Sequence, residues 1–134
     1  MKSRAKWILR SAILLAAVGL CVLGLYLVRI RLYKDKIASI RFQQLDLTEI
    51  PNGSYKGEYD ADIVGAKVIV TVQDGKITDI QLTEHKNERG APAEAVLPKI
   101  IREQRVEVDA ITGATNSSKA IEKAVENALL SQQK

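Results

Sequence analysis

The feature that most constrains this chain is an uninterrupted apolar run near its N-terminus. Residues 11–28 read SAILLAAVGLCVLGLYLV, which is eighteen residues without a charged side chain. A helix of that length rises roughly 27 Å, close to the thickness of the hydrocarbon core of a bilayer. Trp7 and Tyr26 lie near the two ends of the run, where aromatic rings favour the membrane interface. The run therefore predicts one N-terminal transmembrane helix.

Other interpretations of the run fit less well. A cleaved signal peptide has an apolar region of about 7–15 residues that ends in a small-residue cleavage site, whereas here Val28 is followed by RIR. A lipid anchor on Cys21 is disfavoured because bulky Leu20 precedes it and apolar residues continue past it. A buried core helix fits poorly in so short a chain with charge at both ends of the run. We expect a membrane anchor over residues 1–31, a stalk or linker over 32–51, and a soluble domain over 52–134.

The predicted stalk alternates charged and apolar positions at roughly helical spacing. Ile37, Ile40 and Leu45 can form one apolar stripe on such a helix. The sequence Pro51-Asn52-Gly53 is a strong turn signal. Residues 32–50 are therefore expected to continue the membrane helix up to that turn.

Charge separates the anchor from the soluble domain. The chain has a net charge of +4, but residues 1–41 hold nine Lys and Arg against one acidic residue. Residues 42–134 hold eleven basic against fifteen acidic residues, so the domain is mildly acidic. A nucleic-acid-binding domain needs a basic patch, which excludes that class of partner. One cysteine and one histidine exclude an internal disulfide and a conventional metal site built by this chain alone.

The side of the membrane on which the domain lies does not follow from charge. The positive-inside rule compares Lys and Arg on the two sides of the span. Four basic residues precede the apolar run and four follow it within eight residues, Lys2, Arg4, Lys6 and Arg10 against Arg29, Arg31, Lys34 and Lys36. The two flanks carry equal numbers of basic residues, so the rule does not decide the orientation.

Three strands are expected in the soluble domain. Residues 54–60 place Tyr55 and Tyr59 on one face, and residues 67–73 alternate with three valines on one face. Asp74-Gly75 is a favoured hairpin turn, after which residues 76–84 return as the third strand. Residues 84–90 (EHKNERG) are polar and predict a loop.

The remaining residues predict helices that pack on this sheet. Residues 91–104 have helical periodicity interrupted by Pro98, which is expected to kink or restart the helix. Residues 106–108 are a short strand candidate. After a turn over 112–118, apolar residues at helical spacing predict a closing helix with Ser117 or Ser118 as its N-cap. The fold class expected is α+β, a small antiparallel sheet with packed helices, preceded by the transmembrane helix.

The stretch that is chemically the richest is residues 109–118, DAITGATNSS. This stretch joins a strand candidate to the closing helix and carries four hydroxyl side chains and one glycine. Glycine allows close approach of a ligand, and a helix N-terminus presents free N–H groups to an anion. The residues alone leave two interpretations open, a phosphate cradle and a capped turn with incidental hydroxyls.

The pattern D-x-x-T-G-A-T from Asp109 to Thr115 resembles the flavinylation motif of the FMN-binding domain family. That family includes the flavin subunits of sodium-pumping NADH:quinone oxidoreductases and of related ferredoxin-dependent membrane complexes. The resemblance extends over roughly residues 52–130. It includes GSYKGE at 53–58, the hairpin VTVQDGKITD at 70–79, Glu84-His85, and T-x-x-S-K-A at 115–120.

The resemblance implies a covalent cofactor. In the family the last hydroxyl of the motif, here Thr115, forms a phosphoester with FMN. A separate flavin transferase makes the bond from FAD with a divalent metal and releases AMP. Asp109, Gly113 and Ala114 would be recognised by that transferase. The other residues that the resemblance assigns to FMN binding are Thr112, Ser117, Ser118 and Lys119.

His85 is the other candidate for the flavin site. The resemblance implies that it lies near the flavin, where it hydrogen-bonds the ring or tunes its protonation. The alternative is a loop histidine exposed to solvent. The sequence NERGAP at 87–92 departs from the family, which often has Pro-Gly in this loop.

The function expected is that of an electron carrier. No Gly-x-Gly-x-x-Gly follows a strand, and no acid/base pair or nucleophile constellation indicates a substrate pocket, so no catalytic residue is assigned. The resemblance implies an extracytoplasmic domain on a bacterial cell membrane. Its partners would be the transferase and a membrane-bound donor such as a quinone or an NADH dehydrogenase. Alternatives are a non-covalent FMN-binding or sensing module, an accessory flavin subunit of a respiratory complex, and an interaction domain that has lost the flavin.

Overall fold

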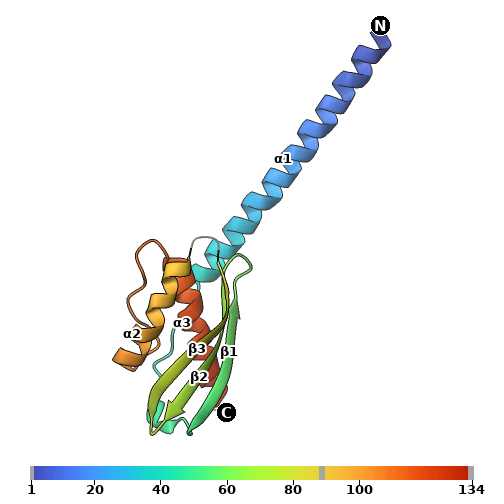
Figure 1. The fold of residues 1–134 in the computed structure, drawn as a ribbon. Helices are drawn as coiled ribbons and strands as arrows, with labels where there is room; N and C mark the ends of the chain where they lie inside the picture. Colours follow the sequence, from blue (N-terminus) through green and yellow to red (C-terminus); the bar gives the residue numbers. More distant parts are fainter. Residues whose placement is uncertain (1, 88–89, 133–134) are drawn as a thin grey trace. The chain divides into compact units, whose positions relative to one another are not determined.

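The computed structural model of the chain describes residues 2–87 and 90–132 and divides into two compact units, Met1–Leu32 and Tyr33–Lys134. The first unit is helical. The second holds the sheet and the helices that pack on it (Figure 1). The elements in chain order are α1 (Lys2–Ala38), the 3₁₀ turn η1 (Leu47–Glu49), β1 (Gly53–Asp60), β2 (Gly65–Gln73), β3 (Lys76–Lys86), the 3₁₀ turn η2 (Ala91–Ala95), α2 (Val96–Glu103) and α3 (Thr115–Leu130).

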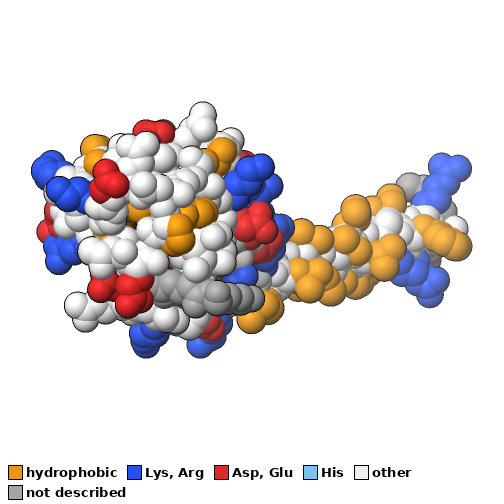
Figure 2. Space-filling model, turned by 90° about the horizontal axis from the view of Figure 1, so that it is seen from below, with side chains coloured by type: hydrophobic (Ala, Val, Ile, Leu, Met, Phe, Trp, Pro, Cys, Tyr) orange, Lys and Arg blue, Asp and Glu red, His pale blue; other side chains and the backbone are white. Residues whose placement is uncertain are grey.

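The first unit consists of the greater part of α1, whose large apolar side chains are exposed. Leu15 and Leu25 are each 72% exposed, and none of the helix's most apolar window is buried. Orange apolar side chains run along the visible face of this helix in Figure 2. The helix is long and apolar enough to cross a membrane, as the sequence predicts. A core helix of a soluble protein would be mostly buried, so its exposure fits a membrane anchor better.

The three predicted strands form one antiparallel sheet in the order β1-β2-β3. Asp74 and Gly75 both have positive φ, 51° and 73°, the backbone signature of the tight hairpin turn that joins β2 to β3. The alternation in β2 is confirmed, because Val68, Val70 and Val72 are all buried. β3 continues to Lys86 and so occupies the first part of the predicted loop 84–90. Glu88 and Arg89 of that loop lie outside the described residues.

The helices cover one face of this sheet. α3 packs on β1 and β2, and α2 packs beside β3 (Figure 1). Val96 and Ile100 of α2 share one buried cluster with Ile121 and Val125 of α3 and with the inward side chains of the strands. Together these observations confirm the α+β class.

α3 approaches β1 unusually closely. A Cβ atom at Gly57 would lie 2.1 Å from the backbone oxygen of Ala124 and 2.5 Å from the backbone nitrogen of Ala128. Both neighbours are helix backbone, which cannot move aside as a flexible side chain can. Only glycine at this position allows the helix to lie so close to the strand.

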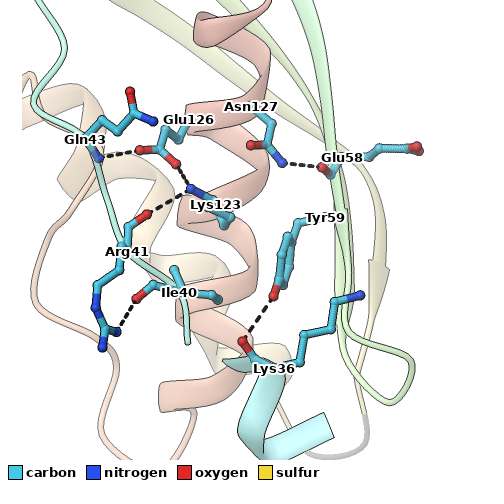
Figure 3. A network of polar contacts seen from close by, with 9 residues as sticks. All are labelled: Lys36, Ile40, Arg41, Gln43, Glu58, Tyr59, Lys123, Glu126 and Asn127. Carbon is cyan, nitrogen blue, oxygen red and sulfur yellow. Dashed lines mark hydrogen bonds and ion pairs between the residues drawn. The ribbon is translucent and has the colours of Figure 1, made fainter. Parts of the chain in front are cut away.

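The C-terminal half of α3 is also held by polar side chains (Figure 3). The Glu126 carboxylate pairs with Lys123 and accepts a hydrogen bond of 2.6 Å from the backbone N–H of Gln43. The Lys123 ammonium donates to the backbone oxygen of Arg41 at 2.9 Å. On the other side of the helix, the Asn127 side chain donates to the backbone oxygen of Glu58 at 2.8 Å. These bonds attach α3 both to β1 and to the segment that follows α1.

That segment is not the continuous helix expected from its periodicity. α1 ends at Ala38, and residues 39–46 have no helical structure. The extended backbone lets the Gln43 amide reach Glu126 and brings Ile40 and Ile50, both buried, to the core. The predicted boundaries at 31 and 51 stay predictions, and the compact unit begins at Tyr33.

Three further local expectations are corrected. Residues 106–108 form no strand; Val106 and Val108 alternate with exposed Glu107 because an extended segment packs there on the core. The segment 91–104 is η2 followed by α2, and the break precedes Val96. Pro98 is therefore in the first turn of α2, where a missing N–H is tolerated.

The third correction concerns the start of the closing helix. α3 begins at Thr115, with Ala114 at the N-cap and no side-chain cap, so neither Ser117 nor Ser118 is the cap. The Ser118 hydroxyl instead donates to the Ala114 oxygen at 2.8 Å and accepts from the Ile111 amide at 3.1 Å. Its side chain thus ties the preceding turn to the first turn of the helix.

Candidate functional site

The start of α3 borders an open pocket of about 360 Å³. Its wall includes four of the residues singled out in the sequence, Gly113, Ala114, Thr115 and Ser117. The other lining residues are Asn116 in the first turn of α3 and three residues from separate segments, Tyr33 from the end of α1, Val64 before β2 and Gly90 before η2. The pocket therefore gathers residues that are far apart in the sequence.

Thr115 is accessible at the edge of this pocket. Its side chain is exposed, and Ala114 before it is buried. Gly113 has a φ of 80°, a left-handed backbone that side chains rarely adopt, and no heavy atom lies within 4 Å of where its Cβ would be. The Thr115 hydroxyl can thus be approached by a large reactant.

The start of α3 offers N–H groups to an anion. The described residues that line the pocket are all uncharged. The first N–H groups of an α-helix have no intrahelical acceptor, and no side chain caps those of α3. Helix dipole and free N–H groups together favour a phosphate at this end. An uncapped helix start beside an exposed hydroxyl fits a phosphate-bearing ligand.

A loop closes one side of the pocket. The backbone of Gly90 lies directly against α3, because a Cβ there would come within 1.9 Å of the Ser117 hydroxyl. Ser117 is itself buried, at 4% exposure. Gly90 is the residue that stands without a preceding proline in the sequence, and here it is what allows the loop to contact the first turn of α3.

His85 lies on the core-facing side of β3, opposite Ala66 of β2. Its side chain is 5% exposed, and Nδ1 lies 3.0 Å from the Glu94 carboxylate in η2. Nε2 is buried and has no hydrogen-bond partner among the described residues. Because a carboxylate accepts, Nδ1 donates in this hydrogen bond, and in the tautomer with its proton on Nδ1 the Nε2 atom is an acceptor. An unsatisfied buried acceptor is a position where a ligand donor can bind.

Neither His85 nor the remaining predicted residues line the pocket. Asp109 is exposed, and its backbone oxygen accepts from Lys99 at 3.2 Å. Thr112 is exposed in the turn, Ser118 is fully buried, and Lys119 is half-buried. Sequence reasoning missed four lining residues. Asn116 and Gly90 stand in stretches it had singled out, whereas nothing local in the sequence marks Tyr33 or Val64.

A second depression, of about 440 Å³, lies over the ends of the strands and is lined mainly by charged residues. These charges pair with one another, Lys67 with Glu84 at 2.9 Å and Lys86 with Asp60 at 3.4 Å. Within residues 2–87 and 90–132, no three His, Cys, Asp or Glu side chains are grouped so that they could hold a metal ion. The pocket at Thr115 is therefore the better candidate site.

Glu122 is a buried carboxyl seven residues after Thr115 on α3, at 2% exposure. Its pKa is raised to about 7, mainly by burial; the negative charges of Glu107 and Asp109 also raise the pKa, whereas the Val108 amide and Lys119 lower it. Its Oε1 has no partner among the described residues. The side chain does not line the pocket, and its burial makes the stability of the domain depend on pH.

Comparison with known proteins bears on the same region. The model of a family described as the FMN-binding domain matches residues 64–130, half of the chain. The matched part runs from the residue before β2 to the end of α3 and contains every pocket residue except Tyr33. No curated protein and no solved structure gives a significant match to the chain.

Proposed function

This chain belongs to the FMN-binding domain family, and we propose that it is a membrane-anchored electron-transfer flavoprotein that carries FMN covalently through Thr115. The observation that carries the proposal is the exposed Thr115 hydroxyl at the uncapped start of α3. A phosphate bound there would lie at the positive end of the helix, next to the open space beside Gly113. The residues present therefore fit the phosphate end of FMN.

The attachment is a phosphoryl-type transfer in which Thr115 is the acceptor. The Thr115 oxygen forms a bond to the flavin-side phosphorus of FAD, and the bond from that phosphorus to the bridging pyrophosphate oxygen breaks. AMP leaves with the bonding electron pair, and the hydroxyl proton passes to a base. A separate flavin transferase and its divalent metal supply that base and the charge neutralisation. This chain contributes an accessible hydroxyl and the helix N–H groups that stabilise the remaining phosphate charge.

Three residues outside the pocket wall keep a place in the proposal. Asp109 is exposed on the turn that leads to Thr115, so a transferase can contact it. Thr112 is exposed beside Gly113 for the same reason. Lys119 is half-buried one turn after Thr115 and adds a positive charge near the phosphate end. Ser118 acts indirectly, since its hydroxyl fixes the turn against the helix.

His85 is proposed to interact with the bound flavin. Its buried Nε2 is held as an acceptor by the Nδ1 contact with Glu94, which suits a donor such as an N–H of the flavin ring. A His85→Gln variant should keep the covalent band and change the flavin absorption spectrum. An unchanged spectrum would remove His85 from the site.

The proposed electron transfer depends on the redox chemistry of bound FMN. When bound, FMN provides the redox chemistry, and the protein provides binding, orientation and electrostatic environment. The apolar helix would place the domain beside donors in the bilayer, a quinone-reducing or NADH-oxidising complex. We propose the outer face of the membrane, where covalent attachment prevents loss of the flavin. Protection of the domain from protease in intact spheroplasts would contradict that orientation.

The deciding experiment is in-gel flavin fluorescence of the full chain, expressed with and without an active flavin transferase. We expect a fluorescent band under denaturing conditions that requires the transferase. Thr115→Ala should abolish it, and Thr115→Ser should retain it because the hydroxyl remains. Thr83→Ala, at another exposed threonine far from the pocket, is the matched control and should stay fluorescent. A wild-type band without fluorescence, beside a fluorescent control protein, would exclude covalent attachment. The remaining interpretation would be a module that binds FMN non-covalently.

A further inference from the structure

Tyr33 is the one lining residue of the pocket that comes from α1. The side chain of Asn116 donates a hydrogen bond of 2.6 Å to the Tyr33 hydroxyl oxygen. Asn116 directly follows Thr115, and both line the same pocket. A residue 83 positions away in the chain is thus bonded to the neighbour of the proposed acceptor.

The end of α1 that carries Tyr33 is firmly packed in the domain. Ile37 is 3% exposed and belongs to a small buried cluster with Ile40, Val64 and Ala120, against which Tyr33 also packs. The Lys36 ammonium donates to the backbone oxygen of Asp60. The position of Tyr33 is therefore held by several contacts within the domain.

The hydroxyl of Tyr33 is left with a proton to donate. A phenol has one O–H donor and can also accept. Asn116 uses the acceptor side, and no other partner of this hydroxyl is present in the described part of the chain. The hydrogen bond from Asn116 orients the oxygen within the pocket wall, which leaves its own O–H available to an acceptor inside the pocket.

We propose that Tyr33 is a phosphate-binding residue of the flavin site, whose hydroxyl, oriented by Asn116, donates a hydrogen bond to the phosphate held at Thr115. This inference rests on the proposed function. Among the described residues that line the pocket none is charged, so these residues offer hydroxyl and N–H donors for hydrogen bonds to an anion. The consequence is that the membrane-proximal end of α1 completes a site whose remaining residues all lie within 64–130.

The test compares two Tyr→Phe variants of the full chain in detergent. Tyr33→Phe removes the hydroxyl that faces the pocket. Tyr59→Phe is the matched control, because its hydroxyl also bonds the end of α1, at the Lys36 oxygen, but Tyr59 does not line this pocket. The rate of covalent flavin attachment by the transferase, the ³¹P resonance of the attached phosphate and the thermal unfolding midpoint are measured for both.

We expect Tyr33→Phe to slow attachment about tenfold, the loss expected for one hydrogen bond to a charged group. Its ³¹P resonance should shift and its unfolding midpoint should match that of Tyr59→Phe. Attachment as fast as in Tyr59→Phe would overturn the inference while leaving Thr115 as the acceptor. Slower attachment with an unchanged ³¹P resonance would also overturn it, since the hydroxyl would then not contact the phosphate. A dark wild-type chain would instead refute the proposed function, and this inference with it.

Discussion

The two ends of α3 differ in exposure and in packing. At its start, Thr115 is exposed, no side chain caps the helix, and the neighbouring Gly113 faces open space. In its second half, Ala124 and Ala128 press against β1, and Glu126 is fully buried in a polar network (Figure 3). The helix is held firmly at the end where no chemistry is proposed.

This difference has a physical reason. A hydroxyl that must meet a transferase has to stay accessible, so it cannot be stabilised by burial. The free N–H groups that suit a phosphate must likewise stay without caps, which leaves the first turn less stable. The second half supplies the fixed position instead. Substitutions at the two ends should therefore separate stability from flavin attachment.

The largest expected effect is at the contact between α3 and β1. Gly57→Ala should destabilise the domain by at least about 4 kcal/mol, because the new Cβ would meet helix backbone at 2.1 Å. Chemical denaturation followed by circular dichroism measures this. Gly53→Ala, in the same strand, is the control. Its Cβ would meet only the side chain of Tyr55, at 3.1 Å, and we expect a loss below about 1 kcal/mol. Equal losses would mean that close packing on β1 does not hold the helix.

The next effect is at the polar network. Glu126→Ala should lower the free energy of unfolding by about 3 kcal/mol, because Lys123 and the backbone N–H of Gln43 both lose a partner in a largely buried place. The estimate is at the low end for a broken buried pair because Lys123 still reaches solvent, at 19% exposure of its side chain. Glu58→Ala is the control, since its exposed side chain is not used by Asn127, which bonds its backbone oxygen. A loss below about 1 kcal/mol for Glu126→Ala would count against the network.

The same division explains what the sequence could predict. Local patterns predicted the strands, because alternation in residues 67–73 and the turn at Asp74-Gly75 are encoded within a few positions. They did not predict that residues 39–46 would be extended. That conformation depends on the contact between Gln43 and Glu126, which are 83 residues apart. Ile37 and Ile40 lie three residues apart, as on one face of a helix, so the periodicity did not reveal that the helix ends at Ala38.

The candidate site divides in the same way. The motif from Asp109 to Thr115 identified the turn and the proposed acceptor because these residues are contiguous. Tyr33 could not be identified from the sequence, since its place beside Asn116 results from the packing of Ile37 in a separate cluster. Ser118 was expected to cap the helix or bind the ligand, and only the structure revealed that its hydroxyl ties the turn to the helix.

Between the two ends, Glu122 should make stability depend on pH. Its pKa in the folded state is about 7, above the ordinary 4.5, so the folded state binds the proton more tightly than the unfolded state. The free energy of unfolding therefore keeps its full value below about pH 4.5 and decreases as the pH rises to about 7. Glu122→Gln should remove this fall, making the variant roughly 2 to 3 kcal/mol more stable than wild type at pH 8 and equal near pH 4.5. Exposed Glu49→Gln is the control, and a wild-type curve that is flat between these values would contradict the role of burial.

The smallest expected effect on stability is at the proposed attachment residue. Thr115→Ala removes an exposed hydroxyl that has no hydrogen-bond partner among the described residues, so the free energy of unfolding should change by less than about 0.5 kcal/mol. The same variant should lose the covalent flavin band entirely. Unfolding is measured on the flavin-free chain, so that a bound ligand does not contribute to either value. A loss of 2 kcal/mol or more would mean that Thr115 supports the helix after all. The first turn of α3 would then serve structure as much as the second half does, and the accessible hydroxyl would no longer indicate a site set apart for chemistry.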